Sequence, residues 1–335
     1  MKILDRGYWI AKHFYWQSLV HWFANGIRFR SMTFFSAGNP AINLGGMLSD
    51  KKTEFYDILP KELLPATTVV STYAEAEQFI EKHQLSYPII MKPNTGLKGM
   101  MVEKVYSAPE LKIFIEDESH DDREWLLQEF LDQEREYAVL MYKYPKSGKY
   151  GISSFIEKIY PSLIADGTST YRELIDEYKN PFLEKEFPLK KFADVLDDIP
   201  AKGSKVVLDE IGNYGRGAKF YSKNAEIDKE MVDTYYDQYK ELTGLNFFRI
   251  DCKADTLEDC KNGNYKILEV NGMKGEPLHI YDPKSTFFGN VKALRLHWSH
   301  IQQVVKEQED LIKDAPTFAE GVRSWRSLVN QFKSQ

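Results

Sequence analysis

The chain has 335 residues, of which 43% are hydrophobic and 28% charged, a composition that is globular rather than disordered or low in complexity. Its formal net charge of −6 argues against a nucleic-acid partner, because neutralising phosphates requires a basic surface. The cysteines, Cys252 and Cys260, are too few for a disulfide framework or a zinc cluster, which fits a reducing, cytoplasmic setting. The length predicts two lobes or one core with additions.

Residues 1–45 are rich in aromatic side chains and are expected to form a helical region. Trp9, Trp16 and Phe23 recur every seven residues, which places one aromatic stripe on a helix. The favoured interpretation is that the stripe packs on the protein itself or on a second subunit of a homo-oligomer. Peripheral contact with a membrane surface is the alternative. Polar and charged residues interrupt the stretch, so it does not predict a membrane span, which needs about 20 nearly uncharged residues.

From about residue 50, helical and strand patterns alternate without a strict repeat, which predicts an α+β fold with mixed and antiparallel sheets. We expect strands from residue 65 and over residues 87–92, 100–106, 125–131, 136–144, 205–210, 247–253 and 265–271. We expect helices over residues 52–59, 72–83, 108–117, 167–178, 227–243 and most of the tail from residue 290. Residues 180–203 are expected to be irregular. A polar, hairpin-like connection over residues 256–263 would leave Cys260 exposed, whereas Cys252 is expected to be buried in its strand.

Two segments each place a pair of polar residues in an otherwise apolar run. They are Arg249-Ile-Asp251 and Glu269-Val-Asn271. In a strand, residues i and i+2 point to the same face, so each pair would project together. On neighbouring strands the two pairs would combine two carboxylates, an amide oxygen and a guanidinium. Oxygen ligands of this kind suit Mg²⁺, which shares its sites with substrate phosphates. The arginine would offset phosphate charge.

A lysine ends the apolar strand at residues 89–92, and Pro93 and a glycine-containing loop at residues 94–99 follow it. Lysine can reach a phosphate as a point charge, and the N–H groups of a glycine loop can close over phosphates. The loop has neither the Gly-Lys-Ser/Thr of a Walker A sequence nor the spacing of a dinucleotide fingerprint. Taken alone, the segment favours an ordinary glycine-rich hairpin tip.

A third segment, residues 127–131, is a strand edge beside a polar turn, and Glu136 follows it. Such an edge can present backbone N–H and C=O groups to an adenine ring, and a carboxylate a few residues later can accept hydrogen bonds from ribose hydroxyls.

The order of these elements resembles the ATP-grasp superfamily: a strand ending in Lys-Pro, a glycine loop, a Glu-Phe-Leu hinge, an acidic residue, then Arg-x-Asp and Glu-x-Asn. The resemblance covers roughly residues 45–290. Within the superfamily, the pattern of this chain is similar to that of the D-alanine–D-alanine ligases. Residues 166–175 and 213–218 instead resemble the ATP-grasp domain of cyanophycin synthetase and bifunctional glutathione synthetase. The resemblance implies an ATP-grasp fold, in which two α/β lobes grip ATP between their sheets.

The resemblance also implies which residues bind the nucleotide: Lys51 (with Lys52 as a register alternative), Lys92, Thr95, Gly96, Lys98, Gly99, Gln128, Glu129, Phe130, Leu131 and Glu136. The lysines would hold the phosphates, and the loop would cover them. The hinge at residues 128–131 would meet adenine, with either Gln128 or Glu129 supplying a side chain. Glu136 would meet the ribose.

For the chemistry, the resemblance implies that Asp251, Glu269 and Asn271 bind Mg²⁺ or Mn²⁺. Arg249 would stabilise a phosphorylated intermediate. Arg216, or else Lys219, would contact a phosphate or carboxylate.

The implied activity is an ATP-dependent, ADP-forming ligase that joins a small-molecule carboxylate to an amine or thiol through an acyl phosphate. The alternatives are a nucleotide-binding scaffold without turnover and a phosphotransferase without a ligation step. The implied domains are an aromatic helical region (1–45), an N-terminal ATP-grasp lobe (46–130), a C-terminal lobe with the metal site (131–290) and a helical tail (291–335).

Overall fold

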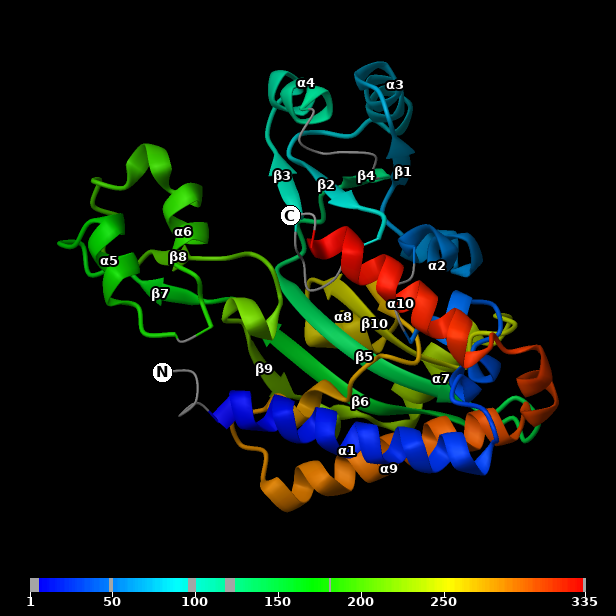
Figure 1. Cartoon of the computed structure of the whole chain (residues 1–335). Helices are drawn as coiled ribbons and strands as arrows, with labels where there is room; N and C mark the ends of the chain where they lie inside the picture. Colours follow the sequence, from blue (N-terminus) through cyan, green and yellow to red (C-terminus); the bar gives the residue numbers. More distant parts are fainter. Residues whose placement is uncertain (1–5, 48–50, 96–100, 118–123, 181, 334–335) are drawn as a thin grey trace.

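The computed structural model describes residues 6–47, 51–95, 101–117, 124–180 and 182–333. Its two main β-sheets are both antiparallel, a layer of helices lies against the larger one, and a small unit projects from one end (Figure 1). One large cavity is lined by residues of both sheets. The mixture of helices and antiparallel sheets is the α+β fold predicted from the sequence.

The smaller sheet holds its strands in the order β1 (Thr67–Val70), β4 (Trp125–Glu129), β2 (Ile89–Pro93) and β3 (Glu103–Val105). Two helices, α3 (Tyr73–His83) and α4 (Ala108–Glu116), pack on it through a core that includes Ile89, Leu111 and Leu127. Helix α3 begins at a capping box, in which Thr72 and Glu75 satisfy each other's backbone N–H groups. The sheet presents the ends of β2 and β4 to the cavity.

The larger sheet has the order β11 (Lys266–Asn271), β10 (Phe247–Ala254), β5 (Arg135–Lys143), β6 (Tyr150–Ile159) and β9 (Lys219–Ser222). Alternate residues of β10 point to opposite faces. Phe248, Ile250 and Cys252 enter the main core with helix α7 (Lys229–Tyr239). The other face is divided: Phe247 packs against α9 (Phe287–Lys306), while Arg249 and Asp251 reach the cavity.

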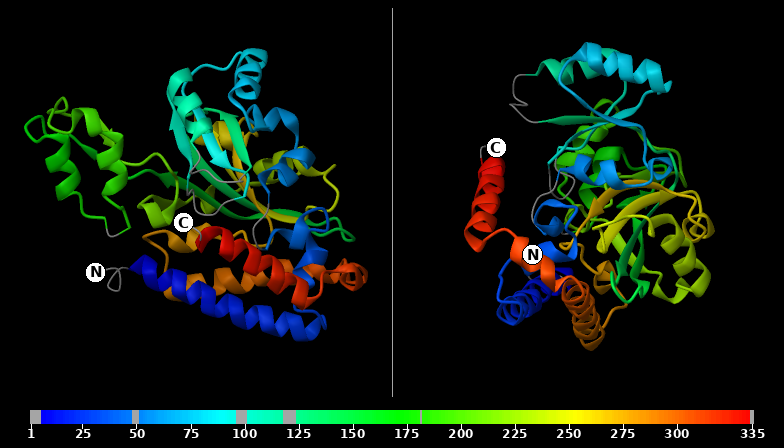
Figure 2. Two further views of the ribbon diagram at one scale, coloured as in Figure 1. Left: turned by 45° about the horizontal axis from the view of Figure 1, so that its top comes forward. Right: turned by 90° about the vertical axis from the view of Figure 1, so that its right-hand side faces the viewer.

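Helices α1 (Arg6–Arg28) and α9 form the helical layer and lie side by side in every view (Figures 1 and 2). Helix α10 (Phe318–Lys333) stands apart from them in the right-hand view of Figure 2. His21 stacks on Trp298 with ring centroids 5.8 Å apart, and Trp298 donates a hydrogen bond to Ser18. The predicted N-terminal helix is therefore present. Its aromatic stripe does not pack inward, because Trp16 and Phe23 are exposed; the side chain of Trp9 lies outside the described residues.

The projecting unit contains the strands β7 (Ser162–Ile164) and β8 (Lys205–Val207) and the helices α5 (Tyr171–Glu177) and α6 (Glu186–Lys191). It closes around its own small core, which includes Leu174, Ile175 and Leu208. Helix α6 falls within the stretch that was expected to be irregular, so that expectation was wrong there.

Two further helices are short: α2 (Lys52–Ile58) and α8 (Leu257–Lys261). The expectation of a hairpin-like connection with an exposed Cys260 was wrong. Thr256 accepts a hydrogen bond from the Asp259 backbone and caps α8, which turns Cys260 inward until it is fully buried. Cys252 is buried, as expected.

Among the described residues, no helix combines the length and apolar character required to cross a lipid bilayer.

Candidate active site

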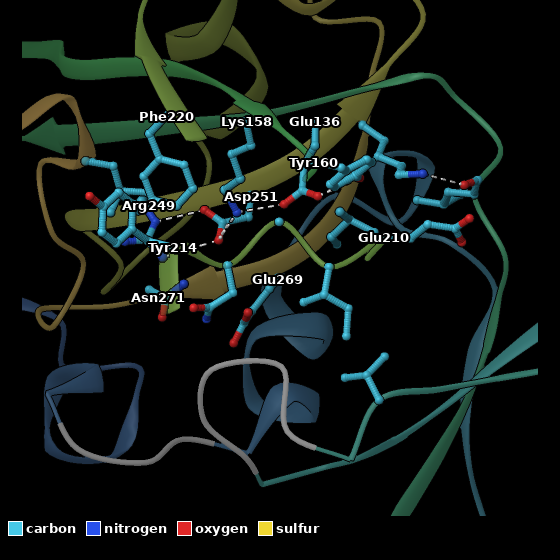
Figure 3. A pocket seen from close by; sticks show the side chains of 18 of the residues that line it. Glu136, Lys158, Tyr160, Glu210, Tyr214, Phe220, Arg249, Asp251, Glu269 and Asn271 are labelled. Atoms are coloured by element: carbon cyan, nitrogen blue, oxygen red, sulfur yellow. Dashed lines mark hydrogen bonds and ion pairs between the residues drawn. The ribbon is translucent and has the colours of Figure 1, made fainter. Parts of the chain in front are cut away.

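The two polar pairs predicted from the sequence lie on adjacent strands and in register with each other. In the antiparallel pairing of β10 with β11, Arg249 is opposite Asn271 and Asp251 is opposite Glu269. All four side chains line one cavity (Figure 3). The register shifts directly after Asp251, so the bulge follows the site and leaves both pairs intact. Two carboxylates, an amide and a guanidinium are therefore gathered on one face of the sheet.

Asp251 is buried between two cations. Arg249 donates to it from Nε at 2.8 Å and from Nη2 at 3.2 Å, and Lys158 donates from Nζ at 3.1 Å. Burial would raise the pKa of Asp251, but the charges of Arg249 and Lys158 outweigh it and lower the pKa below the usual value. Asp251 is consequently an anion at neutral pH.

Lys158 and Tyr160 belong to the same cluster, although the sequence analysis missed both (Figure 3). Glu136 accepts hydrogen bonds from Lys158 Nζ at 2.7 Å and from Tyr160 at 2.8 Å. Burial works against the charge of Lys158, yet the carboxylates of Asp251 and Glu136 raise its pKa. The sequence signal is weak: Lys158 and Tyr160 flank Ile159 at i and i+2, but the charged Glu157 directly precedes them and interrupts the apolar run.

Lys92, the penultimate residue of β2, reaches the cavity, where its ammonium group is buried. It donates to the Gln128 side chain at 2.8 Å, to the Tyr56 hydroxyl at 3.0 Å and to the Leu268 carbonyl at 3.2 Å. Burial lowers the pKa of Lys92 to about 8. Gln128 therefore holds Lys92 with its side chain rather than presenting that side chain to a ligand. Tyr56 is a further member of the site that the sequence analysis missed.

Lys52, and not Lys51, lies in the cavity. Lys52 Nζ reaches the Pro93 carbonyl at 2.8 Å, and burial lowers its pKa to about 8. Lys51 is exposed and pairs with Glu124 at 2.8 Å. Helix α2 begins at Lys52, so consecutive lysines point in different directions, and the register alternative is the one that reaches the cavity.

The predicted phosphate loop is mostly outside the described part of the chain. Thr95 is described and half-buried beside the end of β2, but it does not line the cavity. Gly96, Lys98 and Gly99 lie outside the described residues.

The predicted hinge follows β4 along the cavity wall. The Glu129 carboxylate accepts a hydrogen bond from the Ala66 N–H at 3.0 Å, so that side chain is also used within the protein. The Phe130 ring lies 4.1 Å from Lys104 Nζ and 5.6 Å from Lys253 Nζ, and the Leu131 carbonyl accepts from Lys253 at 2.9 Å. Two cations therefore flank this wall of the cavity.

Arg216 does not line the cavity. Its Nε donates to Asp209 at 2.7 Å, and its guanidinium lies 3.9 Å from the centre of the Phe187 ring. Tyr214 lines the cavity from the same short turn, whereas Lys219, the alternative to Arg216, is exposed and outside the lining. The loop 213–217 thus offers an aromatic side chain to the cavity instead of the predicted cation.

The cavity has a volume of about 1590 Å³, which exceeds the roughly 300–1,000 Å³ of an ordinary small-molecule pocket. The donor set on β10 and β11 fits a hard divalent cation. Asn271 has a buried side-chain nitrogen without a hydrogen-bond partner among the described residues. This nitrogen is a donor that suits a phosphate oxygen, whereas Oδ1 of the same amide is the atom that suits a cation. Within the described ranges no group of three or more His, Cys, Asp or Glu forms a metal cluster, but Mg²⁺ is usually bound by only one or two carboxylates together with substrate phosphates.

No protein-family model matches the chain. Among curated proteins, it is similar to the coenzyme gamma-F420-2:alpha-L-glutamate ligase of Methanococcus maripaludis, with 33% identity over 195 residues, which are 55% of this chain and 66% of that protein. The chain thus spans slightly less than two thirds of this relative.

Similar solved structures are also ligases. The bifunctional glutathione synthetase of Pasteurella multocida matches 81% of this chain and 39% of its own, at 16% identity and a TM-score of 0.42. The D-alanine–D-alanine ligase of Bacillus anthracis in complex with ATP matches 79% of this chain and 68% of its own, at 17% identity and a TM-score of 0.42. The curated relative is a ligase by name, which agrees with the ligase resemblance drawn from the sequence. The α+β architecture of the chain is the one expected from that resemblance.

Proposed function

We propose that the protein is an ATP-dependent, ADP-forming ligase that joins a carboxylate to an amine or a thiol through an acyl phosphate. One observation carries this proposal. The cross-strand pairs Arg249–Asn271 and Asp251–Glu269 face the same cavity as the buried ammonium of Lys92. Groups of the kinds suited to a metal ion, to phosphate and to a nucleotide therefore line one cavity, which supports the proposal because phosphoryl transfer requires them together.

The nucleotide would lie between the two sheets. Lys52 and Lys92 would contact its phosphates, because the side chains of both lysines line the cavity on the side of the smaller sheet. The backbone from Glu129 to Leu131 would meet adenine, since the side chains of Gln128 and Glu129 are engaged within the protein. Glu136, which already accepts from Tyr160, would accept from the ribose.

Asp251, Glu269 and Asn271 would hold Mg²⁺ or Mn²⁺, which supplies neutralisation of phosphate charge when bound. Arg249 would add a fixed positive charge beside these ligands. Its pKa is raised because the pull of Asp251 outweighs the cost of burial, so it stays protonated throughout the working pH range.

The reaction would begin with attack of a substrate carboxylate oxygen on the γ-phosphorus of ATP, which breaks the bond to the β-phosphate oxygen and releases ADP. The amine or thiol would then attack the acyl carbon, lose one proton and displace inorganic phosphate. No covalent bond to the protein is needed. The chain's own contribution is to position the reactants, balance charge through Arg249 and Lys158, and exclude water from the acyl phosphate.

The proposed carboxylate and amine are small molecules. The name of the curated relative states that its own reaction includes L-glutamate, so glutamate is the first amine to test. The two other candidate functions are a phosphotransferase and a non-catalytic scaffold.

Release of ADP, measured with panels of carboxylates in the presence and absence of an amine, separates the three. Turnover that depends on both a carboxylate and an amine or thiol supports the ligase. ADP formation with an alcohol alone identifies a phosphotransferase, and ATP binding without turnover on any panel identifies a scaffold.

A further inference from the structure

Two long segments of this acidic protein contain no acidic residue. The chain has 50 Asp and Glu residues, yet residues 6–49 and 283–306 hold none of them. The same segments contain eight Lys and Arg residues. They include the whole of α1 and the whole of α9, which the fold brings side by side at one surface of the molecule (Figures 1 and 2). Folding thus builds one surface without negative side chains from two separate parts of the sequence.

The solvent-facing side of α1 is apolar. Among the described side chains of this helix, the exposed ones fall at helical spacing, which places them on one face: Lys12, Trp16, Leu19, Val20, Phe23, Ala24, Ile27 and Arg28. Trp16 is 68% exposed and Ile27 is 77% exposed. A surface helix normally turns its polar side to water. Here the half-buried residues include Gln17, Ser18 and His21, so the usual arrangement is reversed.

Helix α9 continues this surface. Phe288 at its start is 82% exposed, Phe287 beside it is 60% exposed, and Leu296 further along is 50% exposed. Lys292 and Arg295 are exposed on the same helix. Large apolar side chains with cations among them therefore cover both helices.

We propose that the α1–α9 surface, defined by Trp16, Val20, Phe23, Ile27, Phe288 and Arg295, binds the surface of a membrane that contains anionic lipids. Aromatic and aliphatic side chains on such a face enter the boundary between headgroups and acyl chains, and the cations attract anionic headgroups. A second copy of the chain would fit the surface less well. In a symmetric dimer the same patch meets itself, which would bring cations together with no carboxylate from these helices between them.

The same two helices connect the surface to the cavity. Ser18, His297 and Trp298, on their inner sides, belong to the cavity lining. A helix with its side chains is about 10–12 Å across, so membrane binding would hold this wall of the cavity roughly one helix diameter from the headgroups.

The test is cosedimentation of the full chain with vesicles of phosphatidylcholine alone and of phosphatidylcholine mixed with phosphatidylglycerol. We expect stronger binding to the anionic vesicles and a loss of that preference at high salt. The double variant Trp16→Ser with Phe23→Ser should reduce the partition constant at least tenfold, and Arg28→Glu with Arg295→Glu should abolish the preference for anionic lipid. Because all four side chains are exposed, circular dichroism should show unchanged folding.

The matched controls are Ile113→Ser and Lys112→Glu on α4. Ile113 is 71% exposed, and Lys112 is exposed beside it, both outside the proposed surface. These variants should bind vesicles as the wild type does. The proposal would be overturned if the wild-type protein bound neither kind of vesicle. A dimer in sedimentation analysis that is lost in the Trp16→Ser, Phe23→Ser variant would overturn it too, in favour of a second copy as the occupant.

Discussion

Lys158 and Asp251 form a buried ion pair, in which Nζ lies 3.1 Å from Oδ2 and the two side chains are 5% and 7% exposed. The same ammonium group lies 2.7 Å from Glu136 Oε1. One lysine therefore separates two buried carboxylates that come from different strands. This arrangement places one cation between two buried carboxylates, and it makes the site sensitive to loss of that cation.

Replacing Lys158 with methionine should lower the free energy of unfolding by about 3–5 kcal/mol, because an uncompensated charge is left buried. Urea denaturation measures this change. Asp251 keeps its bonds to Arg249 in this variant, so Glu136 is the carboxylate left without a cation. Adding Glu136→Gln to Lys158→Met removes that charge, so the double variant should be more stable than the single one. A loss below about 1 kcal/mol in Lys158→Met would mean that the carboxylates do not depend on this lysine.

Consecutive lysines provide a matched test of the phosphate contacts. Lys52→Met should weaken ATP binding by roughly tenfold or more, the value of one charge-assisted hydrogen bond. Lys51→Met should leave the affinity unchanged, because Lys51 pairs with Glu124 outside the cavity. Isothermal titration calorimetry with ATP and Mg²⁺ distinguishes the two. Equal losses of ATP affinity in both variants would show that the position at which α2 begins does not determine which lysine contacts the phosphates.

ATP affinity should fall as pH rises from about 7 to about 9. Burial lowers the pKa of both Lys52 and Lys92 to about 8, so the charged form is complete well below pH 8 and is lost above it. ATP should therefore bind best on the acidic side of this window. Lys52→Arg keeps its charge at every pH in the range and should flatten the profile. An affinity that stays constant across the window in the wild type would contradict the assignment of these two lysines.

Glu269→Gln should lower turnover by at least about 10²-fold and raise the Mg²⁺ concentration needed for half-maximal rate, because one anionic ligand is lost. Asp251→Asn should act in the same direction. Glu258→Gln, an exposed carboxylate on α8, is the control and should retain wild-type turnover. The rate of ADP release, measured with a carboxylate and amine pair found by the substrate panel, reports the effect; unchanged rates in Glu269→Gln would remove this residue from the site.

Strand alternation was enough to predict that Arg249 and Asp251 share a face, and that Glu269 and Asn271 do. It was not enough to predict which residues would be opposite each other, because a shift of one residue between strands reverses every side chain. That register is fixed by the whole sheet, including the shift after Asp251.

Partners that come from distant strands were harder to predict. Lys158 belongs to none of the motifs described above, and its role is visible only once β5 lies between β6 and β10. Gln128 was expected to contact a ligand, but its side chain accepts a hydrogen bond from Lys92 on the neighbouring strand β2. The choice between Lys51 and Lys52 depends on the residue at which α2 begins, and helix ends are poorly defined by sequence.

The most direct test of the central claim is whether the facing carboxylates of Asp251 and Glu269 hold a divalent cation against a nucleotide. Mn²⁺ can be titrated into the protein with a non-hydrolysable ATP analogue while the relaxation rate of water protons is measured. We predict a ternary complex in the wild type and in Glu258→Gln, and at least a roughly tenfold weaker one in both Glu269→Gln and Asp251→Asn. Equal Mn²⁺ binding in all four proteins would contradict the account.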